Sequence, residues 1–247
     1  MKTHSITGMI RHNECDAAGV LKLHHLLDYF QNAAAQHADT LRFGMEDMAD
    51  AGLIWVLARI KLQIVKQPDL YDNFDLITYP TGVNRLFALR QYHMTVGGES
   101  AVRASSQWLM INKSNGRPVN PKKASSLPLP DNPDMEIFFN DIDKITIEDE
   151  TACGSAVVGM GDVDLNRHLN NAVYGRWILD ALGRLSATPV VPSIKDVQIN
   201  FLRAGLPGDQ VSLYGKWDGD GSFTVSGTWA NGETAFQAAG TAERIDF

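Results

Sequence analysis

Apolar residues recur every three or four positions in two long stretches of the chain, and this spacing places them on one face of an α-helix. The first stretch covers residues 20–42 and is closely followed by Gly44, a residue type that often follows the end of a helix. The second stretch covers residues 171–185. A shorter and weaker pattern at 45–51 predicts a third helix.

Alternation of apolar and polar residues predicts a set of β-strands around each long helix. One short strand precedes each helix, four strands follow it, and pairs such as Gly97-Gly98 and Asn231-Gly232 mark the turns. In the first half the predicted strands cover residues 5–11, 53–66, 74–81, 86–96 and 101–112. In the second half they cover residues 155–160, 194–203, 210–217, 222–230 and 234–245.

The same order of elements therefore occurs twice, which indicates an internal repeat. In each repeat a short loop with an aspartate joins the first strand to the helix, and these residues, Asp16 and Asp164, stand 148 positions apart (164 − 16). We predict an α+β fold, a pseudo-dimer in one chain, in which each of two long helices is wrapped by an antiparallel β-sheet. The expected boundaries are an N-terminal half at 1–125, a linker at 126–150 and a C-terminal half at 151–247.

The 247 residues carry a net charge of −7, and 44% of them are hydrophobic. An acidic chain argues against nucleic acid or an anionic membrane as the main partner, because both attract a basic surface. No apolar run reaches the roughly 18 residues of a membrane span, and the N-terminus shows neither a signal nor a transit pattern. Cys15 and Cys153 lie far apart in the sequence and are expected to be reduced thiols, so we expect a cytoplasmic protein.

The densest group of polar side chains lies where the second long helix begins. Asp164, Asn166 and His168 place a carboxylate, an amide and an imidazole at positions i, i+2 and i+4. His168 is suited to take a proton from water, because the usual pKa of histidine is close to neutral. Asn166 is suited to orient water or substrate, and Asp164 either to orient the imidazole or to act as the base. The alternative is a structural role, since these residue types are also common in helix caps and turns.

Two other groups of residues have side chains that are found in metal sites. His24 and Asp28 stand at i and i+4 of the first predicted helix, but two ligands alone do not make a site. The run from Asp218 to Ser222 is similar to the start of a calcium-binding loop, but Trp229 stands where that loop needs a glutamate. A hairpin turn is therefore favoured there, and we expect neither a metal nor a cofactor.

Three segments of the sequence resemble motifs of the fatty acyl-ACP thioesterase family. They are Asp162 to Tyr174 (DVDLNRHLNNAVY) with Trp177-Ile178-Leu179 after it, Gly52 to Arg59 (GLIWVLAR), and Arg103 to Lys113 (RASSQWLMINK) continuing to Arg117 and Pro121. The three segments span both halves of the chain in the order that the family has. This resemblance implies a tandem (double) hot-dog fold, which agrees with the repeat.

The resemblance also implies an activity, the hydrolysis of the thioester that joins a fatty acyl chain to the phosphopantetheine arm of acyl carrier protein. The catalytic Asp, Asn and His of the family fall on Asp164, Asn166 and His168. A further catalytic Glu of the family falls on Ala204, which has no ionisable group, so the sequence departs from the family pattern there. The N-terminal half is expected to hold the acyl chain. Amide groups at the start of the second helix are expected to stabilise the oxyanion.

Asp16 offers a second candidate site. The segment from Asp16 to Val20 resembles the catalytic loop of hydroxybenzoyl-CoA-type hot-dog thioesterases, in which the matching Asp is a nucleophile or base. An acyl-CoA thioesterase that uses Asp16 is therefore one alternative function, although a helix cap or a relic is favoured for this residue. A non-catalytic acyl-binding module is another alternative, and Ala204 is the main observation in its favour.

The implied partners are acyl carrier protein and its fatty acyl-phosphopantetheine group, and both a monomer and a homodimer remain open. Because acyl carrier proteins are acidic, docking requires local positive charge on this acidic chain. The basic residues that cluster in the sequence are Arg85, Arg90, Arg103, Lys113, Arg117, Lys122 and Lys123. A mixed, solvated surface is the alternative interpretation of this set.

Overall fold

The computed structural model describes residues 2–124, 129–140 and 142–246. The chain forms two compact units. The first unit extends to Ile10 and resumes at Tyr29–Ile142, and the second contains Arg11–Asp28 and the chain from Asp143 onward. The Asp16 loop therefore belongs to the same unit as Asp164, which the sequence repeat does not predict. Among the described helices, none is both long and apolar enough to cross a membrane.

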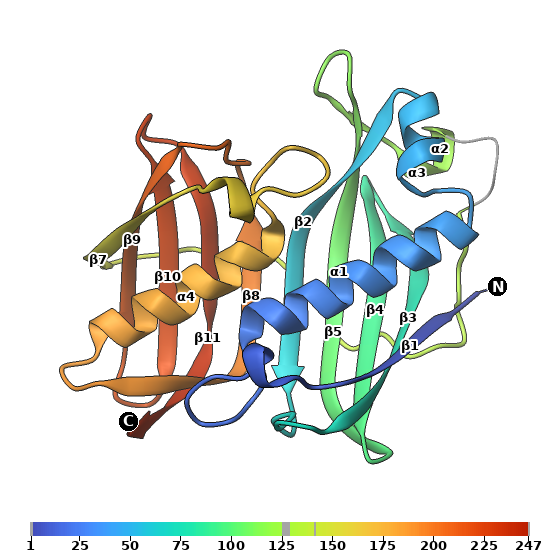
Figure 1. Ribbon diagram of the computed structural model, residues 1–247. Coiled ribbons are helices and arrows are strands. Elements are labelled where there is room, and N and C mark those ends of the chain that lie inside the picture. The colour runs from blue at the N-terminus through green and yellow to red at the C-terminus, as the bar shows by residue number, and fades with distance from the viewer. Residues whose placement is uncertain (1, 125–128, 141, 247) are drawn as a thin grey trace. The chain divides into compact units, whose positions relative to one another are not determined.

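The first unit contains an antiparallel sheet with the strand order β1-β3-β4-β5-β2, and a short strand, β6, pairs with β5. Its strands are β1 (His4–Met9), β2 (Leu53–Ile64), β3 (Asn73–Asn84), β4 (Phe87–Val96), β5 (Glu99–Asn112) and β6 (Pro118–Val119). Its helices are α2 (Met45–Asp50), α3 (Pro121–Ala124) and the part of α1 (Leu23–Thr40) from Tyr29 onward, since the start of α1 up to Asp28 belongs to the second unit. Helix α1 runs across the sheet (Figure 1), and the Phe30 ring stacks on Tyr92 of β4 with 4.7 Å between the ring centroids.

The second unit contains an antiparallel sheet with the strand order β8-β11-β10-β9-β7. Its strands are β7 (Thr151–Val157), β8 (Val190–Phe201), β9 (Gln210–Trp217), β10 (Ser222–Trp229) and β11 (Thr234–Asp246). Helix α4 (Asn171–Leu185) lies across this sheet (Figure 1). Tyr174, Trp177 and Phe236 are almost fully buried and form the aromatic centre of the layer between α4 and the sheet.

The two units have the same internal connectivity. In each, the strand before the long helix and the strand after it stand at the two ends of the strand order, and the next three strands fill the middle. Each apolar helix face covers one face of its sheet, as the periodicity of the sequence predicts. The predicted α+β tandem hot-dog fold is thus confirmed.

Most predicted elements agree with the structure within a few residues, and α4 coincides with the predicted helix at 171–185. The first long helix starts at Leu23 instead of residue 20, because Val20 and Lys22 are held in the preceding loop by backbone hydrogen bonds to Asp16 and Glu14. The strand predicted at 155–160 is β7, which ends at Val157 because the chain then forms a short 3-10 turn.

The predicted linker contains neither a helix nor a strand among the described residues between α3 and β7. Side chains of both units nevertheless hold it in place. In the first unit the Tyr79 hydroxyl donates to the backbone oxygen of Glu136 at 2.9 Å. In the second unit Gln198 Nε2 donates to the backbone oxygen of Asp143 at 2.6 Å.

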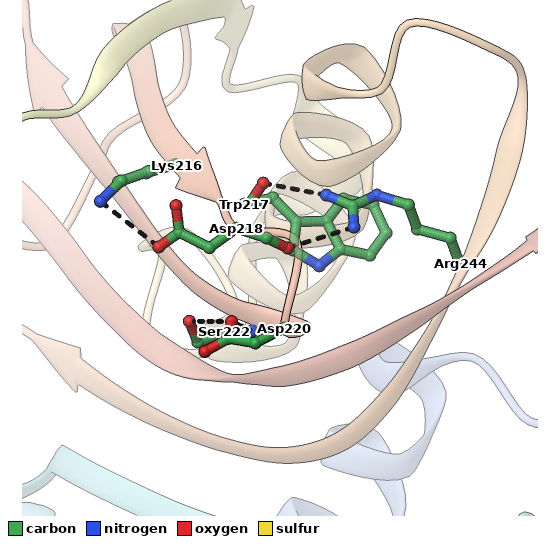
Figure 2. Close-up of polar contacts among 6 residues, drawn as sticks. All are labelled: Lys216, Trp217, Asp218, Asp220, Ser222 and Arg244. Carbon is green, nitrogen blue, oxygen red and sulfur yellow. Dashed lines mark hydrogen bonds and ion pairs between the residues drawn. The ribbon is translucent and has the colours of Figure 1, made fainter.

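The turn between β9 and β10 is the hairpin predicted for the Asp218–Ser222 run, and Figure 2 shows how its side chains are used. Asp220 Oδ1 accepts hydrogen bonds from the amide and the hydroxyl of Ser222, at 2.9 and 2.7 Å. Asp218 pairs with Lys216 at 3.3 Å. Arg244 lies over the Trp217 ring and donates to the backbone oxygens of Trp217 and Asp218. The carboxylates therefore shape the hairpin, as expected for short polar turn residues.

Candidate active site

The loop between β7 and α4 holds the three side chains that the sequence singles out, and Asp164 sets its shape. Asp164 Oδ1 accepts hydrogen bonds from the amides of Asn166 and His168, at 2.8 and 3.4 Å. The Asp164 amide in turn donates to the backbone oxygen of His168 at 2.9 Å. At the apex, Arg167 has a φ of 63°, a left-handed conformation that few non-glycine residues adopt. These bonds bring Asp164, Asn166 and His168 together in one tight, exposed turn.

A backbone carbonyl orients the imidazole of His168. His168 Nδ1 lies 2.8 Å from the backbone oxygen of Asn166. A carbonyl oxygen only accepts hydrogen bonds, so we assign the proton of the neutral ring to Nδ1. Nε2 then carries the lone pair and is free to accept a proton from water. His168 is exposed, so a thioester and a water molecule can reach Nε2.

Asn166 and Asp164 have different roles in this geometry. Asn166 Nδ2 lies 3.4 Å from Asp164 Oδ2, and the Asn166 residue is exposed. The Asp164 carboxylate accepts hydrogen bonds from amide groups of the loop, and Nδ1 of the imidazole donates to the Asn166 backbone carbonyl. Asp164 thus acts on His168 by holding the loop, not by touching its ring.

The Asp16 loop repeats the hydrogen bonds between the aspartate and the loop backbone. Asp16 Oδ1 accepts from the amides of Ala18 and Val20, at 2.9 and 3.2 Å. The Asp16 amide donates to the backbone oxygen of Val20 at 2.9 Å, and Gly19 takes the left-handed position with a φ of 84°. Ala18 and Val20 stand where the other loop has Asn166 and His168. The Asp16 loop therefore has the same backbone and neither the amide nor the imidazole.

The segment after β8 lies against the candidate loop. The Leu169 amide donates to the backbone oxygen of Gly205 at 2.9 Å, and the backbone oxygen of Arg203 accepts from the Tyr174 hydroxyl at 3.2 Å. Ala204 lies between them and is exposed. The position at which the family resemblance expects a glutamate is thus beside the loop but is occupied by a methyl group. The nearby Glu233 is paired with Arg203 at 3.1 Å.

The amides at the start of α4 are partly used by the helix cap. Asn170 Oδ1 accepts from the Ala172 amide and the Asn170 backbone oxygen accepts from the Val173 amide, both at 3.0 Å. Asparagine at this position is a standard N-cap. These two amides are therefore already engaged and do not fit the predicted role of oxyanion donors.

In the structure, Asp28 does not pair with Nδ1 of His24. Asp28 lies 3.7 Å from Nδ1 of His25, whereas Nδ1 of His24 is buried and has no hydrogen-bond partner among the described residues. Burial lowers the pKa of His24 to about 4, with smaller effects from His25 and Lys22. His24 is therefore a neutral, packed side chain at neutral pH.

The seven basic residues proposed for docking fall into different environments. Arg90 does not fit that role, because its guanidinium points inward to Thr78 Oγ1 and His37 Nδ1, each at 3.1 Å, and burial lowers its pKa. Arg103 lies over the Phe138 ring, and Arg85 is exposed in the β3–β4 turn.

The other four basic residues are all exposed around β6 and α3. None of them pairs with a carboxylate in the described part of the chain. We call them the basic cluster: Lys113, Arg117, Lys122 and Lys123. Strand β6 folds back on β5, and both α3 and α2 pack on the same apolar group, so the four lie at one end of the first unit (Figure 1).

The sequence interpretation placed Asp162 within the family motif but assigned no role to Asp162 or to Arg176. Asp162 stands at the base of the loop, and its Oδ1 lies 2.8 Å from Nη2 of Arg176 in α4. The sequence carries no short-range signal for this pair, because Asp162 and Arg176 stand 14 positions apart and only the fold brings the base of the loop beside α4.

Comparisons with known proteins agree with this architecture. The acyl-ACP thioesterase N-terminal domain model matches residues 2–123, and the C-terminal domain model matches residues 148–238. Among solved structures, an acyl-ACP thioesterase from Bacteroides thetaiotaomicron superposes with a TM-score of 0.82 at 22% identity, covering 98% of both chains. The 12:0-ACP thioesterase from Umbellularia californica gives a TM-score of 0.78 at 17% identity, covering 99% of this chain and 98% of that one. These two similarities show the fold.

Plant relatives match in sequence. The palmitoyl-acyl carrier protein thioesterase, chloroplastic, of Arabidopsis thaliana is 28% identical over 195 residues, and that of Gossypium hirsutum is 26% identical over 192 residues. Each match covers 70% of this chain and 45% of the relative, so the chain spans about half the length of these relatives. The two family models together cover most of the sequence, from residue 2 to residue 238. The chain belongs to the acyl-ACP thioesterase family.

Proposed function

We propose that this protein hydrolyses the thioester of fatty acyl-ACP and releases a free fatty acid and ACP. The observation that carries the proposal is the orientation of His168 by the Asn166 carbonyl, which leaves Nε2 able to act as a base. Family membership and the names of the plant relatives support the choice of acyl-ACP as substrate.

In the proposed reaction, His168 Nε2 accepts a proton from water while the water oxygen attacks the thioester carbonyl carbon. The Asn166 amide orients the water or the carbonyl oxygen, and Asp164 keeps the loop in shape. The tetrahedral intermediate collapses with cleavage of the C–S bond, and the proton held by His168 passes to the leaving sulfur. The products are the fatty acid and the phosphopantetheine thiol, and no cofactor or metal enters the reaction.

The remaining expectations from the sequence form part of the same proposal. The N-terminal half at 1–125 holds the acyl chain, the segment at 126–150 links the halves, and 151–247 carries the catalytic loop. Acyl carrier protein is the macromolecular partner, and the basic cluster is its docking surface. A cytoplasmic location stays a prediction from the sequence, since the plant relatives are described as chloroplastic.

The test is release of free thiol from matched acyl-ACP and acyl-CoA substrates. We expect wild-type protein to hydrolyse acyl-ACP, and His168→Ala to lower kcat by about 10²–10⁴-fold, because a positioned base contributes that much.

Asp164→Asn keeps an acceptor oxygen for the loop amides but removes the negative charge. It therefore distinguishes a role of Asp164 in loop shape from a role of its charge. We expect a loss below about tenfold for it, whereas a loss as large as that of His168→Ala would make Asp164 the base.

Asp16→Asn is the matched control, because it makes the same change in the loop that lacks the imidazole. We expect its activity to stay within about twofold of wild type. Preference for acyl-CoA together with a large loss in Asp16→Asn would replace our proposal with the Asp16-dependent acyl-CoA thioesterase.

A second candidate function, a non-catalytic acyl-binding module, is favoured by Ala204, which leaves the loop without the expected glutamate. It predicts binding of the acyl group with no thiol released, so the wild-type measurement alone distinguishes it from hydrolysis.

A further inference from the structure

Asp162 accepts three hydrogen bonds at the base of the candidate loop. Its backbone oxygen accepts from the Asn170 amide at 2.8 Å, and its Oδ2 accepts from the Gly159 amide at 3.0 Å. Its Oδ1 accepts from Nη2 of Arg176 at 2.8 Å. One residue thus joins the strand side of the loop, the cap of α4 and the second turn of α4.

The ion pair between Asp162 and Arg176 is better shielded than an ordinary surface pair. The Asp162 side chain is only 15% exposed, while that of Arg176 is 45% exposed. Fully exposed ion pairs contribute little because water and salt screen them, and a half-shielded pair with a short charge-assisted hydrogen bond holds its geometry more firmly. The pair is therefore suited to fix the loop relative to the helix.

The Asp16 loop provides an internal comparison. Glu14 stands where the other loop has Asp162, and its Oε2 accepts from the Arg11 amide at 2.8 Å, as Asp162 does from Gly159. The position equivalent to Arg176 is Asp28, a carboxylate that cannot form this ion pair with a glutamate. An ion pair between an acidic residue and an arginine thus links the loop to the helix at the loop that carries His168.

We propose that Arg176 is a positioning residue for the proposed thioester hydrolysis. Through Asp162, it holds the His168 loop at a fixed place relative to α4, so that Nε2 stays in line with the thioester. Arg176 acts on Asp162 and not on the substrate. This inference rests on the proposed function, because the loop needs an accurate position only if His168 acts as a base.

Kinetics of four variants test the functional part. We expect Arg176→Gln and Asp162→Asn each to lower kcat about tenfold, with KM within about twofold, because loop position affects the reacting group more than substrate binding. Arg176→Lys keeps the charge and is expected to retain at least about a third of wild-type kcat. The double variant is expected to be no slower than either single variant, since both remove one interaction.

Lys195→Gln is the matched control, because it breaks another ion pair of the same unit, that of Lys195 with Glu243 at 3.0 Å. We expect unchanged kcat for it. Equal losses in Lys195→Gln and Arg176→Gln, or kcat of Arg176→Gln within twofold of wild type, would overturn the proposal.

Hydrogen exchange of the full chain separates this inference from the proposed function. In Arg176→Gln we expect faster exchange in peptides covering residues 159–170 and unchanged exchange in those covering 11–22, the equivalent loop. A wild-type protein that hydrolyses no thioester would overturn the proposed function. Unchanged exchange at 159–170 would overturn the role of Arg176 whether or not the protein is active.

Discussion

At the scale of single residues, the local surroundings decide what each ionisable side chain does. His168 gains a defined tautomer from one backbone carbonyl 2.8 Å away, and exposure leaves its second nitrogen accessible. His24 has the same side chain in the same unit, yet burial makes its charged form costly and lowers its pKa to about 4. The first histidine is suited to exchange protons with substrate, and the second to remain neutral within the packed structure.

His24 makes stability dependent on pH. Its pKa is lowered from 6.5 to about 4 in the folded protein, so between these values the unfolded chain binds more protons than the folded one. The contribution of His24 is therefore fully present above pH 6.5 and is lost as pH falls toward 4. We expect the Tm of wild type to fall in this window by ~2–4 °C more than that of His24→Gln, which corresponds to about 1 kcal/mol.

The measurement is thermal unfolding between pH 7 and pH 4. His12→Gln serves as the control, because His12 is exposed in the 3-10 turn that precedes the Asp16 loop. Parallel Tm curves for wild type and His24→Gln would show that His24 does not carry this dependence.

At the scale of elements, the packing of α4 against the start of α1 depends on the absence of a side chain at Gly175. A Cβ added there would lie 3.0 Å from Leu27 Cδ1 and 3.2 Å from Cα of His24. Such close approach between helix backbones requires a small residue at the crossing. Gly183, in the same helix, has nothing within 4 Å of an added Cβ. A methyl group would therefore crowd its neighbours at Gly175 and meet none at Gly183.

We expect Gly175→Ala to lower the free energy of unfolding by about 1–2 kcal/mol, because overpacking outweighs the gain in helix propensity. Gly183→Ala is the matched substitution, and we expect it to raise the free energy of unfolding by about 0.5–1 kcal/mol. Chemical denaturation of both variants measures the difference, and a stabilised Gly175→Ala protein would contradict the tight crossing.

At the scale of the whole molecule, several exposed cations gather in one place on an acidic chain. The net charge is −7, yet the basic cluster gathers four exposed cations around β6 and α3. A local field of this kind increases the rate of association with an acidic partner and is weakened by salt. We therefore propose the basic cluster as the surface that an acidic carrier protein contacts.

Reversing these charges should weaken the use of a carrier-protein substrate. We expect a variant with all four cations replaced by glutamate to have a KM for acyl-ACP about tenfold higher at low salt, with kcat little changed. Its substitutions are Lys113→Glu, Arg117→Glu, Lys122→Glu and Lys123→Glu. The same variant should use acyl-pantetheine, which lacks the protein, as well as wild type does. Rising salt should raise KM of wild type toward that of the variant. Equal KM values for acyl-ACP at low salt would remove the basic cluster from the docking surface.

Much of this molecule follows from short-range patterns in the sequence. The apolar periodicity predicted both long helices, and α4 matches the predicted range, because the residues that define a helix face lie within a few turns of one another. The spacing of Asp164, Asn166 and His168 likewise predicted one cluster, since a tight loop joins residues that are neighbours in sequence. The repeat of this loop around Asp16 was also visible in the sequence.

Contacts between distant residues were decided only by the tertiary structure. Arg90 and Lys113 are both basic residues in the sequence, but the fold turns the Arg90 guanidinium inward to His37 and Thr78. The pairing of Asp162 with Arg176 and the crossing at Gly175 likewise depend on how α4 lies beside the loop and α1. The physical reason is that local periodicity determines the elements, whereas burial, the desolvation of charges and close backbone contacts depend on residues that only the folded chain brings together.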